Sequence, residues 1–405
     1  MYTRQIYANQ NDRRFMWGIT ACDTRVRACI LTSGGALASH EMDTSTATGR
    51  SEYIQLLVDW SMCDRHQLGF DPSVRWLEDL DCWEIDVSST ASASEGIDQH
   101  PATYSTTYYF DNVYVAASHL FGRHTRCFPA SSKRPASKEF IEPEVLIKDT
   151  WSFVRRRGSS DNDTGEYGEI AFLGRIRQML DQKPEFRNNL PTLVAGGPVR
   201  LDGEGAAVDD TTDSILGELS QELRLAGDGL TDSCYYSHNR MAMTPIGKRL
   251  RDIPSIPDLI LVMHDAVRAH KAVFDNCNIL HRDISENNIL FQHDADGNIH
   301  GMLIDFDNSA DSKAAKHDYR PICTGTLPFM SVNNLRQADV PRTPVDDMES
   351  FLYLLIWLCV WGVTIRHRGR TRNESRRIAD WNADIERAID SKCLRMESDK
   401  SLLGL

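Results

Sequence analysis

The residues best suited to carry out chemistry lie near His281-Arg282-Asp283, which Asn288 follows closely. Asp305 comes next, at the end of the apolar stretch Met302-Leu303-Ile304. A positioned carboxylate can accept a hydroxyl proton, and amide and carboxylate oxygens are ligands that Mg²⁺ accepts. Phosphoryl transfer needs these two groups, so we expect Asp283 to act as the base and Asn288 and Asp305 to hold a metal ion.

The spacing of these residues strengthens the interpretation. The loop has the pattern H-R-D-x-x-x-x-N, and Asp305-Phe306-Asp307 begins 22 residues after Asp283. A hairpin signal, Asp294 to Asn298, lies between the two motifs. Alone, the loop could be a turn with capping Asp and Asn side chains, and a single D-F-D could be the acidic end of a strand. Together they favour phosphoryl transfer.

A lysine upstream completes the set of groups. Val145-Leu146-Ile147-Lys148 has the pattern of a strand that ends in lysine, and Lys148 is expected to contact the α- and β-phosphates. A solvated lysine at a strand end is the alternative. Its expected partner is Glu169, which shares a helix face with Leu173, Ile176 and Leu180; Glu166, one turn earlier, is the other candidate.

Two further segments follow the D-F-D motif. Thr324–Met330 (TGTLPFM) resembles the end of a kinase activation segment. Asp347 then precedes the apolar stretch Phe351–Ile365, which we interpret as a fully buried helix because fifteen residues are short for a membrane span. Asp347 is expected either to brace the backbone of the 281–288 loop or to serve only as a helix cap.

The remaining pattern shows which elements must position these groups. Strands and turns are expected around Phe15 to Met42, with Gly34-Gly35 as a hairpin signal, and then a helix from Tyr53 to Cys63. Val87–Gln99 is expected to be a linker, residues 104–148 to be β-rich, and Tyr167–Leu180 and Pro257–Phe274 to be helical. Residues 200–232 are acidic and rich in glycine, so a partly disordered loop insertion is expected.

Composition excludes several classes of protein. The net charge of −13 over 405 residues disfavours general affinity for nucleic acid or anionic membranes. The ten cysteines contain no C-x-x-C pair, and Met1 to Arg14 is polar, unlike a signal peptide. We therefore expect a protein of the cytoplasm or nucleus that neither spans nor binds a membrane. The sequence does not indicate an oligomeric state.

Several blocks together resemble the fungal-type protein kinase family over about residues 12–390. They are DRRFMWG at 12–18, LGFDP at 68–72, FGRHT at 121–125, IKDTW at 147–151, HRDIS-x-NNI from 281 and DDMESFLYLLIW at 346–357. The resemblance implies an α+β, bilobal, kinase-like fold that binds ATP and Mg²⁺. We expect a β-rich N-terminal extension and linker over 1–100, a β-rich N-lobe over 101–245 that contains the 200–232 insertion, and a mainly helical C-lobe over 246–405.

The sequence departs from the usual kinase pattern at four places. Gly122-Arg123-His124-Thr125 stands where a loop with three glycines normally covers the phosphates, and Gly122 and Thr125 are our candidates for contacting them. Asp307 replaces the usual glycine of the metal motif, and Ser285 replaces a lysine. Ser331-Val332-Asn333 replaces the A-P-E sequence, so the ion pair that ties that segment to the helical lobe should be missing.

The expected function is transfer of the γ-phosphate of ATP to a protein hydroxyl, with serine or threonine favoured over tyrosine. A small-molecule kinase of the aminoglycoside or choline type is the first alternative, because such enzymes share the H-x-D-x-x-x-x-N pattern. The second alternative is a nucleotide-binding pseudokinase scaffold, which the single loop glycine and the absent A-P-E favour. Retention of Lys148, Asp283, Asn288 and Asp305 favours an active enzyme.

Overall fold

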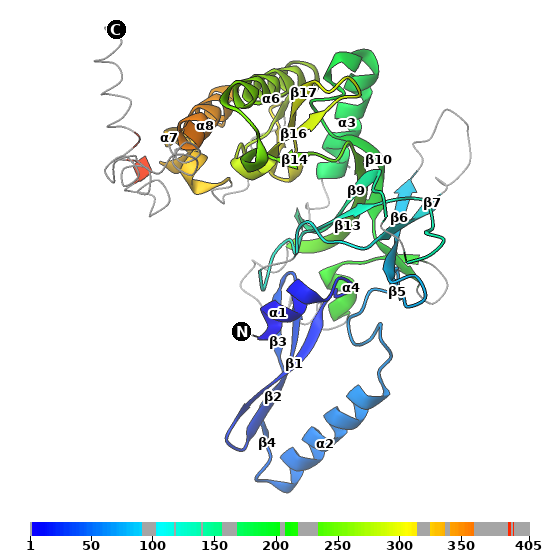
Figure 1. The fold of residues 1–405 in the computed structure, drawn as a ribbon. Coiled ribbons are helices and arrows are strands. Elements are labelled where there is room, and N and C mark those ends of the chain that lie inside the picture. Colours follow the sequence, from blue (N-terminus) through cyan, green and yellow to red (C-terminus); the bar gives the residue numbers. More distant parts are fainter. Residues whose placement is uncertain are drawn as a thin grey trace, which may run out of the picture. The chain divides into compact units, whose positions relative to one another are not determined.

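The computed structural model of the chain describes most of its residues (Figure 1). The described ranges are 2–90, 103–116, 119–138, 141–155, 168–202, 207–217, 234–313, 325–336, 341–359, 388–389 and 392. The chain divides into two compact units. Unit 1 is Met1–Thr164 with Leu193–Thr244, and unit 2 is Gly165–Thr192 with Pro245–Leu405.

Unit 1 begins with a small antiparallel sheet. β1 (Met16–Cys22) pairs with β2 (Arg25–Thr32), and β2 also pairs with β3 (Gly35–Ala38) and β4 (Met42–Asp43). The turn into β3 contains Gly35 with φ +148°, a conformation that residues with a Cβ rarely adopt. The strands and the Gly34-Gly35 hairpin expected from the sequence are confirmed.

Two helices accompany this sheet in the chain. α1 (Tyr2–Asn9) is anchored by Tyr7, whose hydroxyl donates to the carbonyl oxygen of Leu31 at 3.0 Å. α2 (Ala47–Met62) begins after Thr46, whose hydroxyl accepts a hydrogen bond from the Gly49 amide. The helix expected from Tyr53 to Cys63 is therefore confirmed and starts earlier, at Ala47.

A second antiparallel sheet corrects one prediction. β5 (Val74–Leu77), β6 (Cys82–Thr90) and β7 (Thr103–Phe110) pair in this order. The linker predicted from Val87 was wrong at its start, because β6 continues through Ser88 and Ser89 to Thr90, paired with β7. Small hydroxyl side chains fit the pleat of a strand as readily as a loop, and Val87 is fully buried in the core. Residues 91–100 lie outside the described part of the chain.

The main sheet of unit 1 carries Lys148. Its order is β10 (Thr192–Pro198), β13 (Cys234–Thr244), β9 (Val145–Arg155) and β8 (Arg126–Ala130), and the β13–β9 and β9–β8 pairs are antiparallel. The strand predicted to end at Lys148 instead continues to Arg155, because β13 pairs with its whole length. The core against this sheet includes Phe110 and Phe128, whose rings stack 4.3 Å apart.

The acidic segment is more ordered than its composition predicted. β11 (Arg200–Asp202) and β12 (Ala207–Asp209) form a two-stranded antiparallel sheet. α4 (Thr212–Leu216) follows, with a capping box in which Thr211 and Ser214 satisfy each other's backbone amides. The prediction of a loop insertion over 200–232 was therefore wrong for its first part. Residues 203–206 and 218–233 lie outside the described ranges.

Unit 2 contains two long helices at the positions expected from the apolar spacing. α3 (Glu169–Gln182) buries Leu173, Ile176 and Leu180. α6 (Ile256–Cys277) starts after Ser255, which accepts a hydrogen bond from the Asp258 amide, and ends at Asn278 in a left-handed conformation. The range predicted for α3, Tyr167–Leu180, is shifted by two residues toward the N-terminus, and the range predicted for α6, Pro257–Phe274, is one residue short at its start and three at its end.

Short strands and single-turn helices connect the long helices of unit 2. The strands are β14 (Lys248–Arg249), β16 (Ile289–His293) and β17 (Ile299–Leu303) in one sheet, and β15 (Ile279–Leu280) with β18 (Ala310–Asp311) in another. The hairpin expected at Asp294–Asn298 joins β16 to β17. The single-turn elements are η1 (Pro184–Phe186), η3 (Leu250–Asp252), η4 (Glu286–Asn288), η5 (Phe306–Asn308), η7 (Leu327–Phe329) and α7 (Val332–Leu335).

α8 (Pro344–Trp357) corrects the prediction of a fully buried helix. Its N-terminus is a capping box between Thr343 and Asp346, with Pro344 in the first turn. Phe351 and Leu354 are buried, but Leu352 is 49% exposed, so the helix is amphipathic within its described part. Across the described ranges, no helix combines the length and apolar character that a membrane crossing requires.

In unit 2, the backbones of β17 and α6 approach each other closely at Gly301. A Cβ at Gly301 on β17 would lie 2.1 Å from the carbonyl oxygen of Val262 on α6, whereas a Cβ at Gly174 on α3 would meet nothing within 4 Å. Gly301→Ala should lower the free energy of unfolding by about 1–3 kcal/mol through overpacking. Gly174→Ala should raise it by about 1 kcal/mol, because alanine favours helix. Urea unfolding followed by tryptophan fluorescence measures both; equal effects would contradict this packing.

Candidate functional site

The 281–288 loop of unit 2 is held by one buried carboxylate. The backbone amides of His281 and Arg282 donate to the two carboxylate oxygens of Asp347, each at 3.0 Å. His270 Nε2 lies 2.8 Å from the same carboxylate. Arg282 has φ +68°, an uncommon conformation for a non-glycine residue, and these bonds offset its strain. The predicted brace is confirmed, whereas α8 is capped by the Thr343–Asp346 capping box.

Charge at Asp347 is favoured despite its burial. Burial alone would raise the pKa of this carboxyl group, but the His270 hydrogen bond, the neighbouring imidazoles and the Arg282 amide outweigh burial and lower the pKa. For His281, burial dominates and lowers the pKa of the imidazole. The brace is therefore an ionised carboxylate that receives hydrogen bonds from α6 and from the loop.

The Asp283 carboxylate is oriented through both oxygens. Asn308 Nδ2 donates to Oδ2 and the Thr326 hydroxyl donates to Oδ1, each at 3.0 Å. The sequence pattern does not reveal either partner, although Asn308 directly follows the D-F-D motif and Thr326 lies in the TGTLPFM segment. A small recess beside Asp283 is lined by Thr326, Phe329 and Met330 among others. An acceptor group entering this recess would meet a carboxylate of fixed orientation.

Asn288 is buried in η4 next to Asp283. Its side-chain nitrogen donates to the backbone oxygen of Asp283 at 2.8 Å, and its own backbone oxygen accepts from the Ile304 amide. These two bonds connect the loop to the residue that precedes Asp305. The structure thus brings Asp283, Asn288 and the D-F-D motif together in unit 2, as the sequence spacing implied.

Three carboxylates gather at the D-F-D motif. Oxygens of Glu169, Asp305 and Asp307 all lie within 4.8 Å of one another, and Glu169 also accepts a hydrogen bond from the Phe306 amide at 3.2 Å. Asp305 has φ +66°, which sets the start of η5. Hard cations such as Mg²⁺ prefer oxygen donors, so this donor set fits that ion, and Glu169 and Asp307 lie close to the predicted ligand Asp305.

Lys148 belongs to unit 1 and Glu169 to unit 2, so their pairing stays a prediction. Lys148 is 6% exposed and pairs with Met241 of β13 and Cys127 of β8. Glu169 is 2% exposed, which confirms that it points inward from α3. The other candidate, Glu166, lies outside the described residues.

The predicted phosphate loop is tied to β9. The Thr125 hydroxyl lies 2.9 Å from that of Thr150, and the Trp151 amide donates to the Arg123 carbonyl oxygen at 2.7 Å. Gly122 has φ +102°, and its amide donates to the carbonyl oxygen of Ser33 at 2.9 Å. Thr125 is therefore near the strand of Lys148, while the Gly122 amide is engaged within the protein.

Comparison with known proteins identifies the family. A family model described as fungal protein kinase matches residues 1–163 and 175–359. The chain belongs to the fungal protein kinase family. The match includes the N-terminal residues as well as the segments that carry Lys148, Asp283, Asn288 and Asp305. Among curated proteins, none matches the sequence.

In this member of the fungal protein kinase family, hydrogen bonds connect the Ser331-Val332-Asn333 segment, which stands in place of A-P-E, to α8. The Ser331 hydroxyl donates to Asp346 Oδ1 at 2.7 Å, and the Val332 amide donates to Glu349 Oε1 at 3.0 Å. Both acids lie on α8, which also carries Asp347. The segment after η7 is thus held by the helix that braces the loop. Thr324 lies outside the described ranges.

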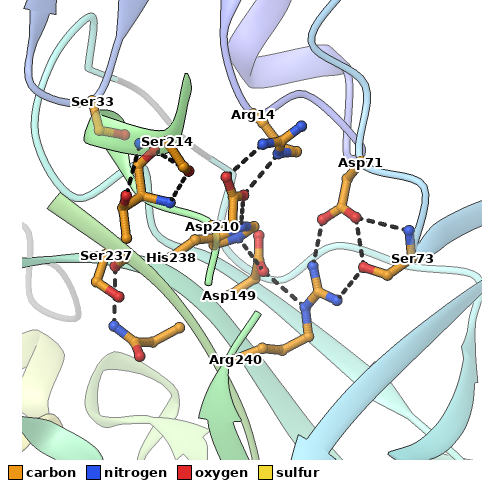
Figure 2. Close-up of polar contacts among 12 residues, drawn as sticks. Arg14, Ser33, Asp71, Ser73, Asp149, Asp210, Ser214, Ser237, His238 and Arg240 are labelled. Atoms are coloured by element: carbon orange, nitrogen blue, oxygen red, sulfur yellow. Dashed lines mark hydrogen bonds and ion pairs between the residues drawn. The ribbon is translucent and has the colours of Figure 1, made fainter. Parts of the chain in front are cut away.

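The residue after Lys148 on β9 is a buried acid. Asp149 is 3% exposed and its Oδ1 accepts from His238 Nε2 at 2.8 Å and from Arg240 Nε at 2.9 Å (Figure 2). Burial disfavours both charges, but the attraction between them lowers the pKa of Asp149 and raises the pKa of His238 to about 9. His238 is therefore an imidazolium at neutral pH.

Loss of the Asp347 brace should destabilise the fold. Asp347→Ala leaves the amides of His281 and Arg282 and the His270 imidazole without their acceptor, and should lower the free energy of unfolding by about 3 kcal/mol or more. Asp275→Ala, at an exposed acid on α6 that pairs with Lys271, should change it by less than about 0.5 kcal/mol. Urea denaturation measures both; a similar, small effect of the two substitutions would show that the brace is dispensable.

His238 should make stability depend on pH. Its pKa is raised from 6.5 to about 9, so between these values the folded protein binds more protons than the unfolded chain. The contribution of His238 is complete below pH 6.5 and declines as pH rises toward 9, by up to about 1.4 kcal/mol per pH unit. Unfolding free energies of the wild type and of His238→Gln should therefore converge over this range.

The control for this pH series is His264→Gln, at an exposed histidine of α6. Groups other than the substituted histidine contribute equally to both members of each pair, so they cancel in the difference. The difference between the wild type and His264→Gln should stay flat from pH 6.5 to 9. A flat difference for His238→Gln as well would contradict a charged His238 in the folded state.

Proposed function

We propose that this protein is an ATP-dependent protein kinase that transfers the γ-phosphate of ATP to a serine or threonine hydroxyl of another protein. The observation that carries the proposal is the arrangement at Asp283, whose two carboxylate oxygens are oriented by Asn308 and Thr326 in a loop braced by Asp347. Membership of the fungal protein kinase family supports it.

In this proposal Asp283 receives the acceptor proton. A hydroxyl in the recess beside Thr326 would donate to Asp283, which orients the oxygen toward the γ-phosphorus and accepts its proton as the new O–P bond forms. The bond between the γ-phosphorus and the bridging oxygen would break in the same step, and ADP would leave with that oxygen. The bonds from Asn308 and Thr326 keep the carboxylate in one orientation, so little reorganisation is needed during transfer.

The remaining site residues would bind the nucleotide. Asn288 and Asp305 would hold Mg²⁺, with Glu169 and Asp307 close enough to add negative charge. A bound Mg²⁺ supplies neutralisation of the phosphate oxygens. Lys148 would contact the α- and β-phosphates and pair with Glu169, while Gly122 and Thr125 would lie over the phosphates.

We extend the proposal to the lobes. Residues 101–245 would form the nucleotide-binding N-lobe and residues 246–405 the C-lobe, with residues 1–100 as an extension. β6 and β7 belong to one sheet, so the boundary at 100/101 would lie within a connection between two paired strands.

One observation favours the scaffold alternative. The Gly122 amide donates to Ser33, and this amide belongs to the only glycine of the predicted phosphate loop. Because this amide is hydrogen-bonded within the protein, the loop offers one donor fewer to a phosphate. A scaffold would bind nucleotide without transferring the phosphoryl group.

The test is a transfer assay with full-length protein, γ-labelled ATP, Mg²⁺ and a cell extract whose own kinases have been heat-inactivated. Wild type should label protein, and Asp283→Asn should reduce the rate by at least about 100-fold, as expected for loss of a general base. Asp275→Asn, at the exposed acid of α6, should retain the wild-type rate.

Three other results would contradict the proposal, each in a different way. Label on a small molecule would indicate a small-molecule kinase. Tight nucleotide binding without transfer would indicate a scaffold. Equal protein labelling by the wild type and Asp283→Asn would remove Asp283 from the mechanism.

A further inference from the structure

A buried network of charged groups lies in unit 1 around Asp149 (Figure 2). One branch runs from Asp149 to His238 and on to Asp210, whose Oδ2 lies 2.8 Å from His238 Nδ1. Arg14 ends this branch with two bonds to the Asp210 carboxylate, at 2.7 and 2.5 Å.

The second branch runs from Asp149 through Arg240. Arg240 Nη2 donates to Asp71 Oδ2 at 2.8 Å, and Nη1 donates to the Ser73 hydroxyl at 2.9 Å and to the Asp86 carbonyl oxygen at 2.8 Å. Figure 2 shows Asp71 and Ser73 converging on one end of Arg240. The guanidinium is thus bonded on all three nitrogens.

The network is desolvated and holds charges of both signs. Arg126 also belongs to it, because its Nη1 lies 3.5 Å from Asp149 Oδ2. The seven ionisable members are at most 4% exposed, and they are the cations Arg14, Arg126, His238 and Arg240 and the anions Asp71, Asp149 and Asp210. Burying these charges costs desolvation free energy, and their mutual attraction roughly offsets that cost. Replacement of a buried ion pair by apolar groups is therefore often neutral for stability. Directional bonds between these groups instead specify one geometry.

The geometry that they specify is that of β9. Asp149 directly follows Lys148, and side chains alternate along a strand, so the network holds the face of β9 opposite to Lys148. On β13, Arg240 pairs with Asp149 and Met241 pairs with Lys148. A slip of one residue would exchange the two faces, and the network therefore fixes the register that presents Lys148.

The residues that close the network come from distant parts of the chain. Arg14 precedes β1, Asp71 precedes β5 and Asp210 follows β12. The Arg14 amide also donates to the Gly69 carbonyl oxygen at 2.9 Å, which joins the two N-terminal contributions. Hence a segment expected to be an extension supplies charges to the main sheet.

We propose that Arg14, Asp71 and Asp210 are positioning residues for Lys148, acting through Asp149, His238 and Arg240. The expected effect on nucleotide affinity rests on the proposed function. The expected effect on the position of the Lys148 side chain is independent of that function. The N-terminal segment would then be required for nucleotide affinity although it touches no nucleotide.

The test replaces one buried ion pair by apolar side chains. The double variant Arg14→Met/Asp210→Leu removes one positive and one negative charge, so the net charge of the network is unchanged. His238 loses its Asp210 partner at Nδ1 but keeps Asp149 at Nε2, so the variant should still fold. The control Arg27→Met/Glu41→Leu removes an exposed ion pair of the same unit, with atoms 3.5 Å apart. Thermal unfolding and circular dichroism check that both variants are folded.

The first readout is the acylation rate of Lys148 by limiting acetic anhydride, quantified by mass spectrometry against the exposed Lys133. Local loosening of β9 should raise the Lys148 rate by at least about threefold in Arg14→Met/Asp210→Leu and leave it unchanged in the control. A purely structural role would change the unfolding temperature without changing this ratio in the folded protein.

The second readout is the affinity for Mg·ATP, measured by calorimetry. The dissociation constant should rise about tenfold in the double variant and stay at the wild-type value in the control. Should the wild type bind no ATP, the proposed function fails, and Lys148 acylation alone still decides the positioning role. Unchanged acylation in the folded double variant overturns the inference.

A conservative variant covers the case in which the double variant does not fold. Arg14→Lys keeps the charge but cannot form two parallel bonds to Asp210. It should increase Lys148 acylation in the same direction by a smaller factor. Wild-type acylation in Arg14→Lys, with the double variant unfolded, would assign Arg14 a role in folding only and would overturn the inference.

Discussion

The candidate site of unit 2 depends on the hydrogen bonds that the Asp347 carboxylate accepts. This carboxylate receives two consecutive backbone amides from the 281–288 loop and a buried imidazole from α6, and these bonds permit the left-handed conformation of Arg282. With that turn set, Asp283 meets Asn308 and Thr326. Since α8 carries Asp346 and Glu349 as well, one helix end holds both the loop and the segment after η7.

In unit 1, the polar contacts next to Lys148 are of a different kind. Where unit 2 uses backbone amides around one carboxylate, unit 1 uses paired side-chain charges on the face of β9 opposite to Lys148. The first arrangement joins a loop to the N-terminal turn of a helix that lies about 65 residues later in the chain. The second joins the N-terminal segment to the main sheet, and the match of the fungal protein kinase model to residues 1–163 includes that segment.

Much of unit 2 could be predicted because its signals are local. The H-R-D loop, the D-F-D motif and the helices α3 and α6 are contiguous patterns, and the inward direction of Glu169 follows from helical periodicity. The bonds from Asn308 and Thr326 to Asp283 could not be predicted, because they depend on tertiary folding. The same holds for the network of unit 1, whose members are ordinary polar residues separated by tens of positions. In β6 and at 200–217, composition favoured loops, but strand pairing and a capping box overrode it.

The most direct measurement is a crystal structure of the protein with Mg²⁺ and a non-hydrolysable ATP analogue. We predict a metal ion bound by side-chain oxygens of Asn288 and Asp305 at about 2.1 Å, with the terminal phosphate facing Asp283 and Lys148 contacting the inner phosphates. A nucleotide bound elsewhere, or a metal ion held without Asp305, would contradict phosphoryl transfer at Asp283.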